Sequence, residues 1–220
     1  MNVCDFQHIT SPPVESTVYK NVERFCAHNH IRVVDGGGYD EERTKKTIDV
    51  QSFIKITATI RNESLGGMVP FYIFIFGQKS TTINKNAFGS KADDIASVMG
   101  PIKDKKAVIM FISERSFKTN VTKAVENQKK KKGAEFLIYS VVHDVFKVDL
   151  ITDASIKHEI MSEAEAAVIK KDYEKNESLI PIISTGDPRV VWMMGMPGQM
   201  VKITHPSIIT GSTVYYRVIK

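Results

Sequence analysis

Basic side chains gather in one stretch of the chain, residues 85–132, which holds 12 Lys and Arg residues against 5 Asp and Glu residues. Cationic groups at this density attract the phosphates of a polyanion such as nucleic acid. A solvated, lysine-rich helix end has the same composition, and the run Lys129–Lys132 fits both interpretations. The candidate nucleic-acid-binding residues are Lys118, Lys123, Lys129, Lys130, Lys131 and Lys132.

Acidic residues in the same stretch allow a second kind of chemistry. Asp93-Asp94, together with Asp104 and Lys106, faintly resembles metal-dependent nucleases, in which carboxylates hold a divalent cation and a lysine assists the attacking water. In such sites the Asp-x-Lys pair lies on a strand, whereas Asp104 here follows the break at Gly100-Pro101. A metal-dependent nuclease is therefore kept only as an alternative.

Histidine and cysteine residues give little support to metal binding or catalysis. Cys26-x-His28-x-His30 brings three potential zinc ligands together, but no Cys-x-x-Cys pair supports them. His143 beside Asp144 is more typical of a core or surface histidine than of a catalytic base. We therefore expect no catalytic residue, no metal and no cofactor.

The composition describes a folded protein. The chain has 220 residues, of which 42% are hydrophobic and 25% charged, enough for one large or two small domains. Its longest apolar runs, Met68–Phe76 and Ala107–Ile112, are far shorter than the roughly 20 residues of a membrane-spanning helix. Met1–Thr10 has no signal-peptide pattern, and two cysteines suit a reducing compartment. We expect no membrane partner, and a location in the cytosol or nucleus.

The first part of the chain alternates between predicted strands and helices. Lys and Arg outnumber Asp and Glu by 22 to 16 up to residue 147, but number 8 against 9 beyond it. The alternation of predicted strands and helices indicates an α/β domain with helices against a central sheet. The runs 69–76 and 107–112 predict strands buried on both faces. Hydrophobic periodicity and end signals predict helices over 18–28, 91–99 and 120–132, and strands over 47–60, 69–76, 107–112 and 136–148.

The remainder predicts a small α+β unit, with a boundary near residues 148–156. Ser162 followed by Glu165 is a capping-box pattern, which predicts a helix through about Glu174. Turn signals at Gly186-Asp187-Pro188, Met196-Pro197-Gly198 and His205-Pro206-Ser207 separate three further segments. These segments, 190–193, 199–204 and 213–219, are predicted to be strands.

An ordered series of motifs runs through this second unit to the end of the chain. It includes Lys157-His158-Glu159, Leu179-Ile180-Pro181-Ile182, Asp187-Pro188, residues 197–203, Pro206-Ser207, Gly211 and Val214-Tyr215-Tyr216-Arg217-Val218. In order and spacing the series resembles the C-terminal domain of the fifth subunit of eukaryotic nuclear DNA-directed RNA polymerases, a domain that archaeal polymerases share. Such a series is far more specific than one short motif. The N-terminal part more loosely resembles the jaw domain found in the eukaryotic subunit.

The resemblance implies an α/β N-terminal jaw domain over 1–147 and a small α+β C-terminal assembly domain over 148–220. It implies a non-catalytic subunit, active in transcription, that docks on the largest polymerase subunit. It further implies a jaw beside downstream duplex DNA, with weak and non-specific contact, and a nuclear location, or a nucleolar or viral one for a polymerase of that kind. The alternative to a polymerase subunit is a free nucleic-acid-binding adaptor.

The resemblance also implies a set of partner-binding residues. Three positions depart from the family pattern, since Val191, His205 and Ile208 stand where charged residues are usual, which puts the family's contacts there in doubt. Two alternatives stay open: Trp192 as a core residue, and Asp187-Pro188 and Pro197-Gly198 as plain hairpin turns. The implied residues are His158, Asp187, Pro188, Trp192, Gly198, Pro206, Ser207, Gly211 and Arg217.

Overall fold

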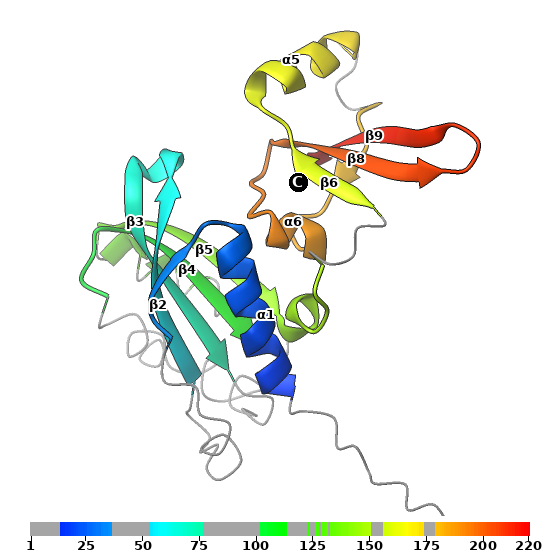
Figure 1. Ribbon diagram of the computed structural model, residues 1–220. Helices are drawn as coiled ribbons and strands as arrows, with labels where there is room; N and C mark the ends of the chain where they lie inside the picture. The colour runs from blue at the N-terminus through cyan, green and yellow to red at the C-terminus, as the bar shows by residue number, and fades with distance from the viewer. Residues whose placement is uncertain are drawn as a thin grey trace, which may run out of the picture.

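The computed structural model describes residues 14–36, 53–76, 102–113, 123, 126–127, 129–131, 133–150, 156–173 and 179–220. The described chain forms two β-sheets, one built before residue 150 and one after it (Figure 1). The predicted helix 91–99 lies outside the described residues, as do Asp93-Asp94, Lys118 and Lys132.

The first sheet is mixed and has the strand order β1-β2-β3-β4-β5. β1, β2 and β3 are antiparallel neighbours, whereas β3, β4 and β5 run parallel. Antiparallel strands need only a tight turn between them, which the 3-10 helix η1 (Glu63–Leu65) and Gly66 provide between β2 and β3. The strands are β1 (Arg32–Asp35), β2 (Phe53–Asn62), β3 (Gly67–Phe76), β4 (Lys106–Ser113) and β5 (Glu135–Val142).

Helix α1 (Val14–His28) covers one face of this sheet (Figure 1). Val18, Val22 and Phe25 recur at helical spacing and are fully buried against the strands, so the amphipathic pattern is the reason that the helix packs here. The helix ends at the Asn29-His30 pair, where His30 takes a positive φ of 54°. The predicted helix over 18–28 is confirmed.

The two central strands behave as their sequences indicate. In β4 every residue after Lys106 is buried, as expected of a strand covered on both faces. The last four residues of β3, 73–76, are also buried, whereas Tyr72 is half-buried and Met68 near the start of the strand is exposed. The prediction for residues 69–76 therefore holds for the inner half of that strand.

The prediction of one long strand over 136–148 is wrong at its C-terminal end. β5 stops at Val142, and residues His143–Phe146 form a 3-10 helix, η3. The chain turns there because Val145 and Phe146 fold back under α1, where the rings of Phe146 and Phe25 lie 5.5 Å apart edge to face. Burial of these side chains outweighs their strand propensity.

The helix predicted over 120–132 is helical at each of its described positions, which are 123, 126–127 and 129–131. Gly133 follows in the left-handed region with a φ of 56°, and its N–H donates to the carbonyl of Lys130. This is the usual way for glycine to end a helix. The predicted end of the helix before Gly133 is confirmed.

The second sheet is smaller and has the strand order β6-β8-β9-β7. Its strands are β6 (Lys157–Ile160), β7 (Ile182–Ile183), β8 (Met200–Ser207) and β9 (Gly211–Ile219). Helix α5 (Glu163–Asp172) begins with the predicted capping box, in which Ser162 and Glu165 each bond the other's backbone N–H. That part of the sequence prediction is confirmed.

The predicted strand over 190–193 is wrong, because these residues lie in and just after the short helix α6 (Pro188–Trp192). Asp187 caps the helix by accepting the N–H of Arg189 at 2.9 Å, and Pro188 occupies the first turn, where its missing N–H costs nothing. Asp187-Pro188 is thus a helix start, and its interpretation as a plain hairpin turn is also wrong.

Helix α6 lies between the two sheets (Figure 1). Val190 packs into the core of the second sheet, while Val191 and Trp192 join the core formed by α1 and the first sheet. One helix of five residues therefore supplies side chains to both cores.

No helix in the described ranges is both long enough and apolar enough to cross a membrane.

Candidate interaction surfaces

Lysines from two segments meet at one end of the first sheet. The segment before β4 is tied to the start of β5, because the N–H of Glu135 donates to the carbonyl of Lys105 at 2.8 Å. The N–H of Ala134 in turn donates to the carbonyl of Lys129. Lys103 and Lys105 are therefore brought beside the helix end that carries the lysine run.

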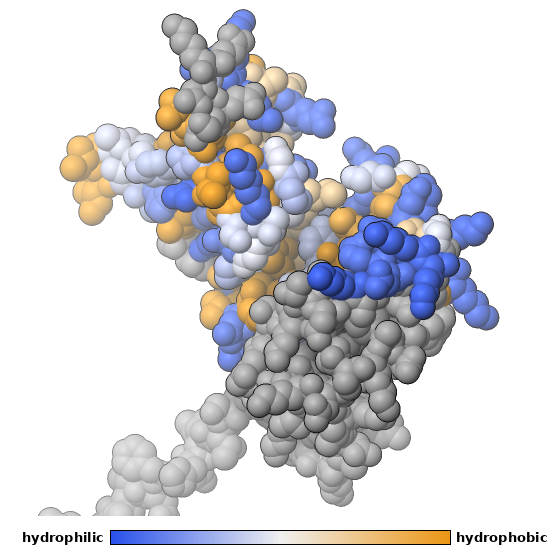
Figure 2. Space-filling model, turned by 180° about the vertical axis from the view of Figure 1, so that it is seen from behind, coloured by the Kyte–Doolittle hydropathy of each residue, from blue (hydrophilic) through white to orange (hydrophobic). Residues whose placement is uncertain are grey.

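We call Lys103, Lys105, Lys129, Lys130 and Lys131 the basic edge. Four of these residues are exposed and Lys129 is half-buried. Figure 2 shows hydrophilic side chains gathered over this end of the first sheet. No ion pair of a basic-edge lysine is found in the described part of the chain, whereas neighbouring Lys106 pairs with Glu135 at 3.0 Å. Cationic groups without carboxylate partners suit contact with phosphates.

Of the predicted nucleic-acid-binding lysines, Lys129, Lys130 and Lys131 lie on this edge. Lys123 is exposed on the same helix, two turns earlier. Lys103 and Lys105 were not among the predicted residues, although they lie inside the basic stretch 85–132. Only the pairing of β4 with β5 reveals that they adjoin the lysine run.

Around His158, the second sheet and α6 bring several polar side chains together. His158 on β6 lies opposite Ile203 on β8, and its Nδ1 lies 3.4 Å from the carbonyl oxygen of Ile156. That same oxygen accepts a hydrogen bond from Nη1 of Arg189 at 3.0 Å. Burial lowers the pKa of His158 below its usual 6.5, and the nearby charge of Arg189 acts in the same direction.

The hairpin formed by β8 and β9 carries three further predicted residues. Pro206 and Gly211 are exposed, and the side-chain oxygen of Ser207 accepts the N–H of Thr210 at 3.2 Å. Gly211 has a φ of 76° with open space around it, so glycine is required there for its backbone conformation. The tip of the hairpin is thus an ordered turn.

The remaining predicted residues do not join one surface. Arg217 is exposed on β9 and donates to the carbonyl of Ile182 at 3.2 Å, at the β7 side of the sheet. Gly198 lies in the turn before β8 with a φ of 89°. Trp192 is only 3% exposed, which agrees with its interpretation as a core residue and leaves its ring unable to touch a partner in this conformation. The partner-binding role of the set stays a prediction.

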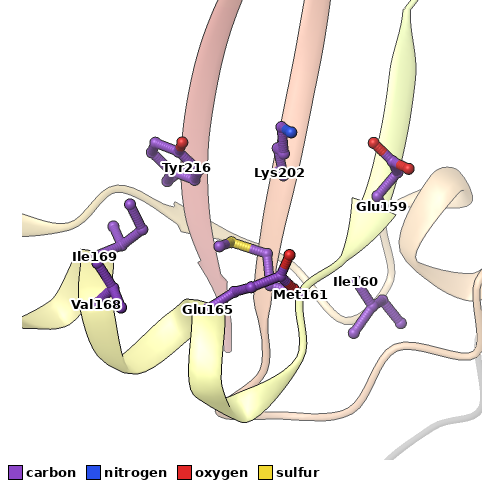
Figure 3. A pocket seen from close by; sticks show the side chains of 8 residues that line it. All are labelled: Glu159, Ile160, Met161, Glu165, Val168, Ile169, Lys202 and Tyr216. Atoms are coloured by element: carbon purple, nitrogen blue, oxygen red, sulfur yellow. The ribbon is translucent and has the colours of Figure 1, made fainter.

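A groove of about 390 Å³ lies between α5 and the second sheet (Figure 3). Glu159, Lys202 and Tyr216 line it from three adjacent strands, and Glu165 lines it from α5. Hydrogen bonds from Ser162 lower the pKa of Glu165, and Glu159 pairs with Lys157 at 2.8 Å. The carboxylate of Glu165 is thus stabilised in the charged form, which is the opposite of what a general acid requires.

The described residues give little support to the nuclease alternative. Asp104 accepts a hydrogen bond from the hydroxyl of Tyr72 at 2.7 Å, and burial with this bond raises the pKa of Tyr72 to about 12. Lys106 is held by Glu135 and by the carbonyl of Leu65. Both residues of the Asp-x-Lys pair thus already serve structural contacts.

The zinc alternative fails on geometry. Cys26 is 1% exposed, because its side chain lies in the core between α1 and the first sheet, where burial raises the pKa of the thiol to about 12. His28 is exposed at the end of α1, and His30 is exposed in the turn that follows. In the part of the chain that the structure describes, no three His, Cys, Asp or Glu side chains gather as metal ligands would.

The fold consists of a mixed-sheet unit joined to a small α+β module, and no cluster of three potential metal ligands occurs among the described residues. Residues 152–219 match the family described as RNA polymerase Rpb5, C-terminal domain. The chain belongs to this family. The match comprises β6 to β9 with α5 and α6, and the first sheet lies outside it.

Three archaeal relatives, each called DNA-directed RNA polymerase subunit Rpo5, support this assignment. The protein of Nitrosopumilus maritimus is 39% identical over 61 residues, which are 28% of this chain and 74% of the relative. That of Archaeoglobus fulgidus is 35% identical over 63 residues, or 29% and 83% of the two chains. That of Thermococcus celer is 32% identical over 76 residues, or 34% and 88%.

Proposed function

We propose that this protein is a non-catalytic subunit of a DNA-directed RNA polymerase. The carrying observation is the similarity of its second unit to most of the length of the archaeal Rpo5 subunits. In this proposal the C-terminal assembly domain, residues 148–220, docks on the largest subunit, and catalysis resides in other subunits. The exposed polar and apolar residues of the β8–β9 hairpin and the group around His158 support a docking role.

The N-terminal jaw domain, residues 1–147, is proposed to lie near downstream duplex DNA during transcription, which places the protein in the nucleus or wherever its polymerase works. The basic edge supports this role, because five lysines on one edge suit sequence-independent contact with phosphates. The contact is expected to be weak outside the assembled enzyme, since few charges take part.

Affinity capture of the tagged full-length chain from its native cells tests the proposal. We expect the large subunits of an RNA polymerase to co-purify in amounts equal to the tagged chain, as measured by quantitative mass spectrometry. Recovery of nucleic acid alone, with no polymerase subunit, would instead support the alternative of a free nucleic-acid-binding adaptor, which the basic edge also favours. Nuclease treatment before capture separates direct protein contact from bridging by nucleic acid.

A further inference from the structure

Two adjacent isoleucines stand fully exposed at the tip of the β8–β9 hairpin. Ile208 is 106% exposed and Ile209 is 94% exposed, and neither joins a hydrophobic cluster in the described part of the chain. Turn tips usually carry Gly, Asn, Asp, Ser or Pro, because these residues suit the backbone conformations and local hydrogen bonds of tight turns. Figure 2 shows hydrophobic side chains at the far end of this projection.

The tip projects because β8 and β9 extend further than the strands beside them. β6 pairs with β8 only as far as Thr204, and β7 pairs with β9 only at Val218 and Ile219. The outer half of the hairpin is therefore a two-stranded ribbon that extends beyond the sheet (Figure 1). A projecting apolar tip is convex, so a partner must offer a concave apolar surface.

The ribbon holds its tip in one conformation. The N–H of Thr210 donates to the side chain of Ser207, and its hydroxyl donates to the carbonyl of Ser212 at 3.3 Å. His205 and Tyr215 pack edge to face across the strands, with ring centroids 5.4 Å apart. A turn whose backbone is already ordered loses less entropy on binding than a flexible loop does, which favours a contact at its tip.

The lack of charged residues around the tip argues against nucleic acid and an anionic membrane as the partner. Residues 203–216 contain no Lys, Arg, Asp or Glu. Nucleic acid would need cationic side chains here, and an anionic membrane surface would need Lys or Arg beside the apolar residues. Two isoleucines alone offer far less than the roughly 1,200 Å² that a stable protein–protein contact buries, so other residues must contribute to the same interface. The tip therefore fits a larger protein interface of which it forms the apolar centre.

We propose that Ile208 and Ile209 form an apolar plug that inserts into a hydrophobic pocket on a neighbouring protein subunit. This rests on the proposed function, in which that neighbour belongs to the polymerase. The plug lies beside Pro206 and Gly211, two of the partner-binding residues that the family resemblance implies. The neighbouring pocket must be neutral and lined by aliphatic or aromatic side chains.

The test compares tagged full-length variants in the native cells, each in competition with an equal amount of untagged wild-type chain. Ile208→Thr with Ile209→Thr keeps branching at Cβ but adds hydroxyls, and we expect its share of assembled polymerase to fall at least about tenfold. Ile208→Val with Ile209→Val should keep most of its share. Ile182→Thr, at an isoleucine 56% exposed on β7, is the matched control and should assemble like wild type.

The possible outcomes distinguish failure of the proposed function from failure of the apolar plug. If the wild-type chain captures no polymerase, the proposed function fails and the plug fails with it. If the wild-type chain captures polymerase and the double threonine variant assembles equally well, the plug is wrong while the function stands. A dimer of the purified wild-type chain that the variant abolishes, or binding to phosphatidylserine vesicles that it abolishes, would also overturn the plug in favour of self-association or a membrane.

Folding is checked by the urea midpoint of each purified variant, which should not change because the side chains are exposed. If the double threonine variant unfolds more easily, the single variant Ile209→Lys takes its place, since a charge at the tip must oppose entry into an apolar pocket. Normal assembly of folded Ile209→Lys would then contradict the proposal.

Discussion

The indole N–H of Trp192 donates a hydrogen bond to the carbonyl oxygen of Val145 at 2.9 Å. Trp192 belongs to α6 and Val145 to η3, so this bond joins the second unit to the first. The ring also packs edge to face on Phe25, and Asn29 donates its side-chain amide to the carbonyl of Trp192 at 2.9 Å. The two units therefore share a core and are expected to unfold together.

Removal of this bond should destabilise the whole chain. Trp192→Phe leaves the carbonyl of Val145 buried without its donor, which costs roughly 1–3 kcal/mol. Trp192→Ala also leaves a cavity and should cost roughly 3–5 kcal/mol. Urea unfolding, followed by circular dichroism, measures both. Tyr215→Phe, at an exposed ring, is the control and should change stability by less than about 0.5 kcal/mol. An unchanged free energy of unfolding for Trp192→Ala would contradict the shared core.

A glycine missed by sequence reasoning should tolerate no side chain. A Cβ on Gly195 would lie 2.6 Å from Cδ1 of Ile219 and 2.9 Å from Cγ1 of Val190, both of them buried. Gly195→Ala should therefore lower the free energy of unfolding by roughly 1–3 kcal/mol through overpacking. Gly186→Ala is the matched control, because its Cβ would meet only Ser184 at an ordinary 3.6 Å. Equal urea midpoints for the two variants would show that Gly195 is not crowded.

The basic edge should influence DNA affinity through salt. Replacement of Lys129, Lys130 and Lys131 by Gln is expected to weaken the affinity of the assembled polymerase for downstream duplex DNA uniformly across sequences. The slope of log affinity against log salt should fall by roughly one for each phosphate that a lysine no longer neutralises. Lys170→Gln with Lys171→Gln is the control, since these lysines also end a helix but lie on α5. An unchanged slope would mean that the lysine run only complements its helix dipole.

The environment of His158 should make stability depend on pH. Burial lowers its pKa in the folded state below the unfolded value near 6.5, so the unfolded chain binds more protons between the two values. Stability from this group is complete above pH 6.5 and is lost as the pH falls towards the folded pKa. The effect is modest because the ring is partly exposed, and because the carbonyl of Ile156 and, more weakly, Asp187 oppose the lowering of the pKa. Urea midpoints from pH 7.5 to 5 should vary less for His158→Gln; an identical dependence would exclude His158 as the cause.

Local patterns were enough to predict several elements. The apolar stripe of α1, the capping box of Ser162 and Glu165, and the glycine after the lysine run each act within a few residues, so the sequence contains their full physical cause. The run Ala107–Ile112 likewise predicts a strand covered on both faces, because no side of it is polar. A turn was also predicted at Met196-Pro197-Gly198, and Gly198 has a positive φ there.

The strand predicted over 190–193 was wrong because the sequence of this short segment fits two kinds of structure. Asp187-Pro188 favours both a turn and a helix start, and the apolar residues that follow are too few for periodicity to separate strand from helix. The end of β5 was missed for another reason. Phe146 leaves the strand direction because it meets Phe25, which lies more than a hundred residues away in the sequence.

By itself, the sequence determined the family of the C-terminal part, the basic character of the first unit, and most helix and strand cores, because these depend on residue type and short spacing. Tertiary structure alone decided which residues meet. It buried Trp192 against Val145, 47 positions away, and it brought Lys105 beside Lys129 through strand pairing. It also left Ile208 and Ile209 uncovered, since exposure depends on which elements pack over a residue and not on its own hydrophobicity.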